Sequence, residues 1–241
     1  MRRLLGALRR ADERFQMIQN GDKIAVGVSG GKDSMAMLYA LTLYKLFSKK
    51  EYELIALCVD LGFESYNTDI IQQYCDRLET PLTIIKTQIA EIVFDIRKEK
   101  NPCALCAKMR KGALYERAVD LGCNKAAFAH HANDVTETLL MSMMYESRLN
   151  TFSPKTYLSR RDITLIRPLI LADEADIKGA VHANNIPIAK NPCPIDFSTK
   201  REQTKELLRH LNTLEKRSSS NIFKAISNPD TYNLWNKDFD W

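Results

Sequence analysis

Short apolar runs alternate along the chain with longer stretches whose apolar residues recur at helical spacing. The short runs are rich in β-branched residues and predict strands at residues 23–28, 54–59, 82–86, 125–129 and 163–166. The longer stretches predict helices at residues 35–47, 69–78, 89–96, 102–121, 134–145, 174–184 and 200–214. Because strands and helices alternate throughout, we expect an α/β fold: an open parallel sheet with helices on both faces.

The two ends of the chain depart from this alternation. Arginine and leucine alternate near the start, which predicts an amphipathic helix within residues 1–20. Residues 215–241 are polar and aromatic and predict a C-terminal tail, which leaves residues 21–214 as one globular domain. No apolar run approaches the roughly 18 residues that cross a bilayer, and none follows the basic start as in a secretory signal. We therefore expect a cytoplasmic protein.

The composition and net charge limit the class of protein and the kinds of partner that the sequence allows. The hydrophobic share of 45% and the charged share of 27% are typical of a soluble globular protein. A net charge of +5 permits nucleic-acid binding without demonstrating it. Several basic residues are candidates for contacts with RNA phosphates, with an ordinary solvated charge as the alternative for each. They are Arg2, Arg3, Arg9, Arg10, Arg160, Arg161, Arg167, Lys200 and Arg201. Six cysteines in a chain expected in the cytoplasm favour metal or thiol chemistry over disulfides.

A glycine-rich segment at residues 29–34 joins the first predicted strand to the first long helix. It is not a Walker A loop, because position 26 is Val and Asp33 stands where Ser or Thr is required. Its glycines also have the wrong spacing for a dinucleotide-binding loop. Gly30 and Gly31 let backbone N–H groups approach an anion at the positive end of the following helix. Further groups suited to phosphate or Mg²⁺ are the side chains of Ser29, Lys32, Asp33 and Ser34.

The cysteines fall into two classes. Cys103 and Cys106 open a predicted helix, and their spacing puts both thiols on one face of its first turn. The backbone N–H groups at a helix N-terminus favour thiolates, which suits a metal ligand or a reactive thiol. The CxxC spacing alone is equally compatible with a redox pair, with half of a zinc site or with chance. Cys193 lies between two prolines that fix its backbone, and it is the third candidate. Residues expected to fill the core instead are Cys58, Cys75, Cys123, Met141, Met143 and Met144.

The segment Ser-Gly-Gly-Lys-Asp-Ser resembles the loop of the PP-loop ATP pyrophosphatase superfamily. The resemblance implies that ATP is cleaved between its α- and β-phosphates and that AMP is transferred to a substrate oxygen. It also implies ribose or adenine contacts at Asp60, which ends the second predicted strand, with a strand-end cap as the alternative. His130 and His131 follow a strand end, where they would orient nucleotide or Mg²⁺ beside the loop. A helix cap at Asn133 is the other reading of that segment.

Three further segments resemble the tRNA 2-thiocytidine synthetases: residues 103–115, residues 129–134 with Thr138, and residues 166–169. The resemblance implies an enzyme that adenylates the C2 oxygen of a tRNA base, a cytidine in the anticodon loop, and replaces that oxygen with sulfur. It further implies a [4Fe-4S] cluster held by Cys103, Cys106 and Cys193, with one iron left without a protein ligand. The residues it assigns to catalysis are Lys32, Asp33, Cys103, Asp134 and Cys193.

Two features depart from the pattern of that group. Asn133 stands where the synthetases carry an aspartate, and the surroundings of Cys193 are closer to the tRNA 2-thiouridine enzymes, although no second CxxC pair is present. The expected cofactors are ATP, Mg²⁺ and a [4Fe-4S] cluster, and the expected partners are tRNA and a sulfur source, either a cysteine desulfurase or free sulfide. A homodimer is compatible with the sequence. The alternative is another adenylating enzyme without a catalytic cluster, such as a lysidine-type RNA-modifying enzyme or a small-molecule amide or thio ligase.

Overall fold

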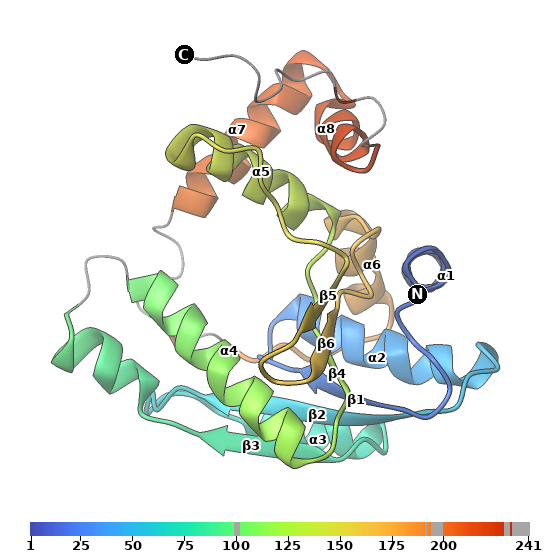
Figure 1. The fold of residues 1–241 in the computed structure, drawn as a ribbon, viewed down its shortest axis with the longest axis vertical. Helices are drawn as coiled ribbons and strands as arrows, with labels where there is room; N and C mark the ends of the chain where they lie inside the picture. The colour runs from blue at the N-terminus through green and yellow to red at the C-terminus, as the bar shows by residue number, and fades with distance from the viewer. Residues whose placement is uncertain (99–101, 191, 194–199, 229–231, 233–241) are drawn as a thin grey trace. The chain divides into compact units, whose positions relative to one another are not determined.

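The computed structural model describes residues 1–98, 102–190, 192–193, 200–228 and 232 (Figure 1). The chain divides into two compact units. The first comprises Met1–His131 and Ser153–Asp196, and the second comprises Ala132–Phe152 and Phe197–Trp241. The domain boundaries expected at residues 20 and 214 remain predictions.

A six-stranded sheet forms the centre of the first unit, in the order β3-β2-β1-β4-β6-β5. Neighbouring strands run parallel except at the edge, where β5 is antiparallel to β6. Ile24, Ala25 and Val26 in β1 are fully buried, as expected for a central parallel strand covered on both faces. The predicted fold class is confirmed, although the edge strand β5 was not predicted. The strands are β1 (Asp22–Gly27), β2 (Tyr52–Asp60), β3 (Leu82–Lys86), β4 (Lys125–Ala127), β5 (Lys155–Leu158) and β6 (Ile163–Ile166).

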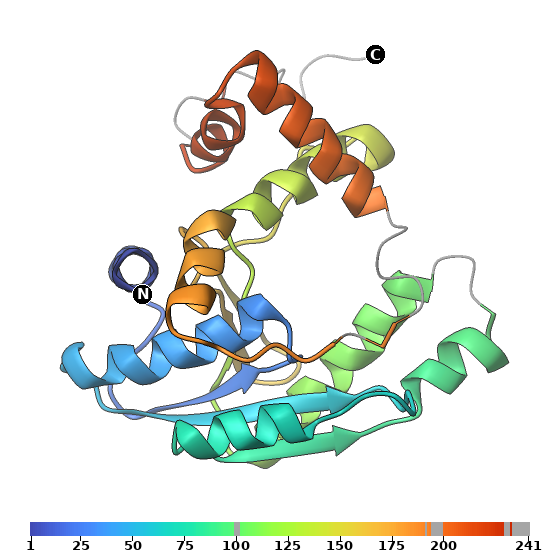
Figure 2. The ribbon, with the colours of Figure 1, turned by 180° about the vertical axis from the view of Figure 1, so that it is seen from behind.

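Helices cover both faces of this sheet (Figures 1 and 2). The π-helix η1 and helix α4 lie on one face, over a buried cluster that includes Leu57, Val93, Leu114 and Leu165. Helices α2, α3 and α6 lie on the other face, and α1 packs against α2 and α6. These helices are α1 (Arg2–Phe15), α2 (Lys32–Phe47), α3 (Asp69–Arg77), η1 (Glu91–Ile96), α4 (Pro102–Asp120) and α6 (Glu174–Ala183).

The order of the strands determines where a ligand can bind. The chain moves outward from β1 to β2 and β3 and then returns to the other side of β1 for β4. In open α/β sheets, ligands bind outside the carboxyl ends of the strands at such a reversal. The loop at residues 28–31 follows β1, and His130 and His131 follow β4, so both segments lie at this reversal.

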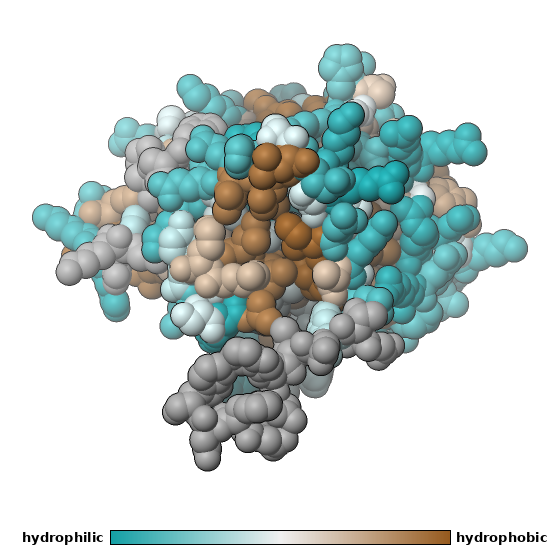
Figure 3. Space-filling view, turned by 90° about the horizontal axis from the view of Figure 1, so that it is seen from above, coloured by the Kyte–Doolittle hydropathy of each residue, from teal (hydrophilic) through white to brown (hydrophobic). Residues whose placement is uncertain are grey.

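The second unit consists of helices α5 (Ala132–Glu146), α7 (Lys200–Leu214) and α8 (Ser218–Ile226), which pack against one another. Helix α8 lies within the residues expected to form a tail and was not predicted. The expectation that Met143 and Met144 fill the core is wrong, because they are 47% and 46% exposed. Figure 3 shows apolar side chains gathered in a band on the face that it views. Among the residues described, no helix is both long and apolar enough to cross a membrane.

Candidate active site at the phosphate loop

Gly30 fixes the shape of the phosphate loop. Its φ of +77° lies in the left-handed region that glycine favours. A Cβ added at this position would lie 2.6 Å from Cβ of Ala189 and 3.3 Å from Cδ1 of Ile71. The backbone is held as well, because the Ala189 N–H donates to the Gly30 carbonyl at 3.0 Å. This position therefore requires glycine, both for its conformation and for the close approach of the segment that leads to Cys193.

Ser34 closes the loop from the inside. Its hydroxyl accepts the Ser29 N–H at 3.1 Å and donates to the Gly31 carbonyl at 2.9 Å, and the residue is buried. This hydroxyl therefore holds the loop together, and its contact with a phosphate remains a prediction. The first hydrogen bond within α2 runs from the Met35 N–H to the Gly31 carbonyl. The N–H groups of residues 32–34 precede that bond and form the anion-binding end of the helix.

Lys32 lies between two carboxylates. Its Nζ is 2.9 Å from Oδ2 of Asp33 and 3.0 Å from Oε1 of Glu174. Burial alone would lower the pKa of Lys32, but the charges and hydrogen bonds of both carboxylates outweigh burial and raise this pKa. Burial alone would raise the pKa of Glu174, yet Lys32 and Lys178 lower it to about 2. Glu174 was not predicted from the sequence, where its only signal is its place in the first turn of a helix.

Other predicted residues lie at the same edge of the sheet. His131 is buried, and its Nε2 lies 3.8 Å from Oδ1 of Asp33. Asp60 ends β2, and its Oδ1 accepts the Gly62 N–H at 2.9 Å, which is the capping contact given above as the alternative. Its contact with nucleotide therefore remains a prediction. Tyr66, which was not predicted from the sequence, donates its hydroxyl to the Ser29 carbonyl at 3.2 Å.

The three candidate cluster cysteines all belong to the first unit. Cys103 is exposed, Cys106 and Cys193 are partly buried, and none forms a disulfide. Burial raises the pKa of the Cys106 thiol, Arg110 lowers it, and Cys193 and Cys103 raise it further. Each of the other two thiols is therefore near enough for its charge to act on Cys106. Among the described residues, no group of three or more His, Cys, Asp or Glu side chains has a geometry ready to hold a metal ion.

The remaining cysteines pack in the interior as predicted. Cys58, Cys75 and Cys123 are all buried, and burial raises the pKa of Cys75 to about 12. Such thiols are inert at neutral pH, so they differ in kind from the three candidates. The motif around Cys193 is described only in part, because Asn191 and residues 194–197 lie outside the described residues.

Asp134, predicted to be catalytic, is described within the second unit. Its Oδ1 lies 3.1 Å from Nη1 of Arg201, and the same nitrogen lies 3.2 Å from Oε2 of Glu137. Glu137 is buried, so Arg201 neutralises an interior carboxylate as well as Asp134. Arg201, expected from the sequence to touch RNA or to be solvated, therefore forms ion pairs within this unit, and a contact with RNA remains a prediction. The catalytic role of Asp134 remains a prediction.

Arg167 is buried, so it is not exposed at the surface as a contact with RNA would require. Its Nη1 donates to the Ser153 carbonyl at 2.6 Å while its N–H donates to the Pro154 carbonyl at 3.0 Å. Burial lowers the pKa of this guanidinium, and the nearby Tyr115 opposes that change. Arg167 therefore fixes the segment before β5 at the end of β6.

Comparisons with known proteins agree with this geometry. The family of the PP-loop domain matches residues 7–211. A tRNA-cytidine(32) 2-sulfurtransferase of Pelobacter propionicus is 37% identical over 230 residues, which cover 94% of this chain and 86% of that protein. Its counterpart in Syntrophotalea carbinolica is 37% identical over 198 residues, or 82% and 76% of the two chains. The solved U34-tRNA thiolase NcsA from Methanococcus maripaludis, with its [4Fe-4S] cluster, has a similar fold, with a TM-score of 0.76 and 22% sequence identity. The match covers 96% of this chain and 80% of that protein.

Proposed function

This chain belongs to the PP-loop family, and to the tRNA-cytidine(32) 2-sulfurtransferases within it, and from that premise we propose how it acts on tRNA. It uses ATP to activate a cytidine of tRNA, the one at position 32 that its relatives' name specifies, and it replaces the C2 oxygen of that base with sulfur. The base lies in the anticodon loop, where it is reached unstacked, so the enzyme avoids most of the cost of opening a duplex.

The phosphate loop would bind ATP. The N–H groups at the start of α2 face the phosphates, and Lys32 adds a positive charge held in place by Glu174. Asp33 supplies a carboxylate for Mg²⁺. His131, whose Nε2 lies 3.8 Å from Oδ1 of Asp33, would orient this carboxylate. In the first step the C2 oxygen attacks the α-phosphorus, the bond to the bridging oxygen breaks, and pyrophosphate leaves.

The three cysteines would hold the iron-sulfur cluster. The donor set fits, because thiolates are the usual ligands of such clusters and the charges of Cys103 and Cys193 both act on Cys106. When bound, the cluster supplies sulfur for the second step, with a cysteine desulfurase or free sulfide as the source. In that step a carbon–sulfur bond forms at C2, and the carbon–oxygen bond breaks as AMP leaves.

The observation that carries this proposal is the contact between Ala189 and Gly30. The hydrogen bond at 3.0 Å fixes the segment that leads to Cys193 directly on the phosphate loop. The activated oxygen and the sulfur must meet at one carbon, and this contact joins the two parts of the chain that would carry them. We further propose that the enzyme acts in the cytoplasm, and a homodimer is compatible with this function.

The test is tRNA thiolation by the anaerobically purified protein. Purified protein, ATP, Mg²⁺, sulfide and a tRNA with cytidine at position 32 should yield 2-thiocytidine, detected by mass spectrometry of nucleosides. Release of pyrophosphate should depend on the tRNA. Lys32→Ala should abolish both, and Lys45→Ala, a lysine at the other end of α2, should abolish neither. Pyrophosphate release without any thiolated nucleoside would reject the proposal and favour a lysidine-type or ligase reaction.

A further inference from the structure

Helix α1 carries a row of arginines on one side. Its buried side consists of Leu4, Ala7, Leu8 and Ala11, each at most 2% exposed. The opposite side is exposed and carries arginines separated by four and seven residues, spacings that align side chains along a helix. We call this side the arginine face; its members are Arg2, Arg3, Arg9, Arg10 and Arg14.

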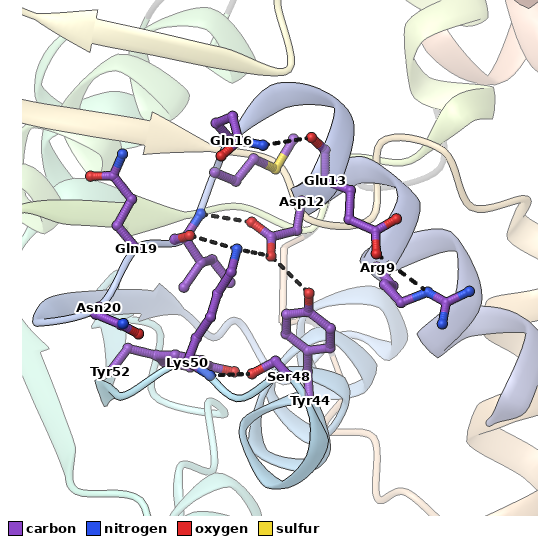
Figure 4. Close-up of polar contacts among 12 residues, drawn as sticks. Arg9, Asp12, Glu13, Gln16, Gln19, Asn20, Tyr44, Ser48, Lys50 and Tyr52 are labelled. Carbon is purple, nitrogen blue, oxygen red and sulfur yellow. Dashed lines mark hydrogen bonds and ion pairs between the residues drawn. The ribbon is translucent and has the colours of Figure 1, made fainter.

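The helix is fixed to the body of the first unit by a buried ionic network (Figure 4). Asp12 is 1% exposed and accepts hydrogen bonds from the Tyr44 hydroxyl at 2.7 Å, the Ile18 N–H at 2.8 Å and Lys50 Nζ at 2.5 Å. Lys50 Nζ also donates to the Ile18 carbonyl at 2.7 Å. A buried charge with this many partners holds its helix in a single position. The arginine face is therefore a fixed surface.

Contacts at both ends of α1 determine where this surface points. Asp12, near its C-terminus, bonds to Tyr44 near the C-terminus of α2. Arg3, near its N-terminus, lies 3.6 Å from Asp176 in the first turn of α6, the turn that contains Glu174. Glu174 in turn contacts Lys32 in the phosphate loop. The N-terminal end of the arginine face therefore meets the first turn of α6, whose Glu174 contacts Lys32, and α1 runs across α2 at a steep angle (Figures 1 and 2).

Gly6 lies midway along the arginine face. Glycine inside a helix weakens it, so a packing reason would be expected for its presence. A Cβ at this position would meet only Nη1 of Arg10, at 3.4 Å, among the described residues. Packing therefore does not require glycine here. The missing side chain leaves the helix backbone open between the arginines, which suits close approach of a phosphate.

The charge of this surface favours a polyanion. Five arginines stand against two acids, Glu13 of α1 and Asp176, which pairs with Arg3; the local balance is therefore 5 − 2, or +3, when the whole chain carries +5. Among the residues the structure describes, Arg2 and Arg10 form no ion pair, and Arg9 reaches Glu13 only at 3.8 Å. A basic amphipathic helix can also bind an anionic membrane, but that requires its apolar side, which is buried in the core here.

We propose that the arginine face binds the phosphodiester backbone of the tRNA, away from the base that reacts. The proposal rests on the proposed function, since it assigns this surface to the same substrate. Charges that contact phosphates fix the position of a nucleic acid without reading its sequence. The surface would then hold the tRNA while its anticodon loop reaches the phosphate loop.

The test compares two charge-matched triple variants in tRNA binding. One is Arg2→Gln, Arg3→Gln and Arg10→Gln. The control is Lys45→Gln, Arg77→Gln and Arg117→Gln, which removes three cations from the last turns of α2, α3 and α4. Binding of transcribed tRNA is measured between low and high salt, with thermal melting to confirm folding. Each lost phosphate contact should weaken binding roughly fivefold near 0.15 M salt and flatten the salt dependence by about one unit of slope.

The arginine variant should therefore bind tRNA roughly 100-fold more weakly, with a slope reduced by about three, and the control should match the wild type. Replacing the same arginines by lysine should restore most of the affinity. The KM for tRNA should rise, and tRNA-dependent pyrophosphate release at saturating tRNA should persist. Equal tRNA binding by the two triple variants would overturn the inference. It would also be overturned if the arginine variant lost binding to anionic vesicles but still bound tRNA like the wild type. If the wild type binds tRNA through this face but forms no 2-thiocytidine, only the proposed function fails.

Discussion

Replacing Gly30 by alanine tests how tightly the phosphate loop and the Ala189 segment are joined. The φ of +77° costs a non-glycine residue roughly 1–2 kcal/mol. The new Cβ would lie 2.6 Å from Cβ of Ala189, an atom that cannot rotate away because it is attached directly to the backbone. Moving that backbone would stretch the 3.0 Å hydrogen bond from Ala189 to Gly30. Overpacking of this kind costs about 1–3 kcal/mol, so we expect a total loss of roughly 2–5 kcal/mol.

Thermal unfolding gives the measurement, since about 1 kcal/mol shifts the midpoint by roughly 2–4 °C in a chain of this size. Gly30→Ala should therefore melt roughly 5–20 °C below the wild type. The control is Gly31→Ala, where φ is −70° and the nearest atom to a new Cβ is Ser29 Oγ at 3.5 Å. The control should lose no more than about 1 kcal/mol, the usual effect of alanine at a helix N-cap.

A second substitution separates the two causes. Ala189→Gly removes the atom that the new Cβ would strike but leaves the backbone conformation of residue 30 unchanged. In a double-mutant cycle, the pair Gly30→Ala and Ala189→Gly should recover the overpacking part and keep the conformational part. Equal melting of Gly30→Ala and Gly31→Ala, or zero coupling between positions 30 and 189, would refute the account of this junction.

Three further substitutions address the charges around the site. Glu174→Gln should lower the free energy of unfolding and raise the KM for ATP, because Lys32 loses a partner. The pKa of Glu174 in the folded protein is about 2, so the difference in stability between variant and wild type should shrink as the pH falls from 4.5 towards 2. A difference in urea unfolding that does not change with pH would contradict this. Asp12→Asn should cost roughly 2–4 kcal/mol in urea unfolding, because it breaks a buried ion pair. The exposed control Glu13→Gln should change stability by less than about 0.5 kcal/mol, and equal effects would contradict the network. Arg201→Gln should lower the melting temperature, because it leaves two neighbouring carboxylates unneutralised; an unchanged melting temperature would contradict the ion pair.

The parts of the site that sequence could predict are those formed by neighbours along the chain. The strand, glycine loop and helix at residues 22–47 follow one another directly, so spacing alone indicated the phosphate site. The pair Cys103 and Cys106 is likewise one helical turn. The parallel sheet followed from the regular alternation of strands and helices, whereas β5 alternates exposed and half-buried residues and so has no apolar run.

The parts that sequence could not predict depend on contacts made by the fold. Glu174 reaches Lys32 only because α6 packs beside α2, and nothing near Glu174 in the sequence announces that contact. Arg167 and Arg201 looked like surface cations, but one is buried and the other pairs with acids. The role of the Ser34 hydroxyl in holding the loop together could not be predicted either, because it depends on the conformation of the loop backbone.

The assignment of the three cysteines to one cluster can be decided by a single comparison of variants. Wild-type protein and the variants Cys103→Ser, Cys106→Ser, Cys193→Ser and Cys123→Ala are reconstituted anaerobically with iron and sulfide and then assayed for bound iron and for 2-thiocytidine in tRNA. Cys123 is buried outside the site and serves as the control. We expect each of the three serine variants to lose the cluster and the thiolated nucleoside, and the control to keep both. Full iron content together with full thiolation in any one of the three serine variants would contradict the assignment.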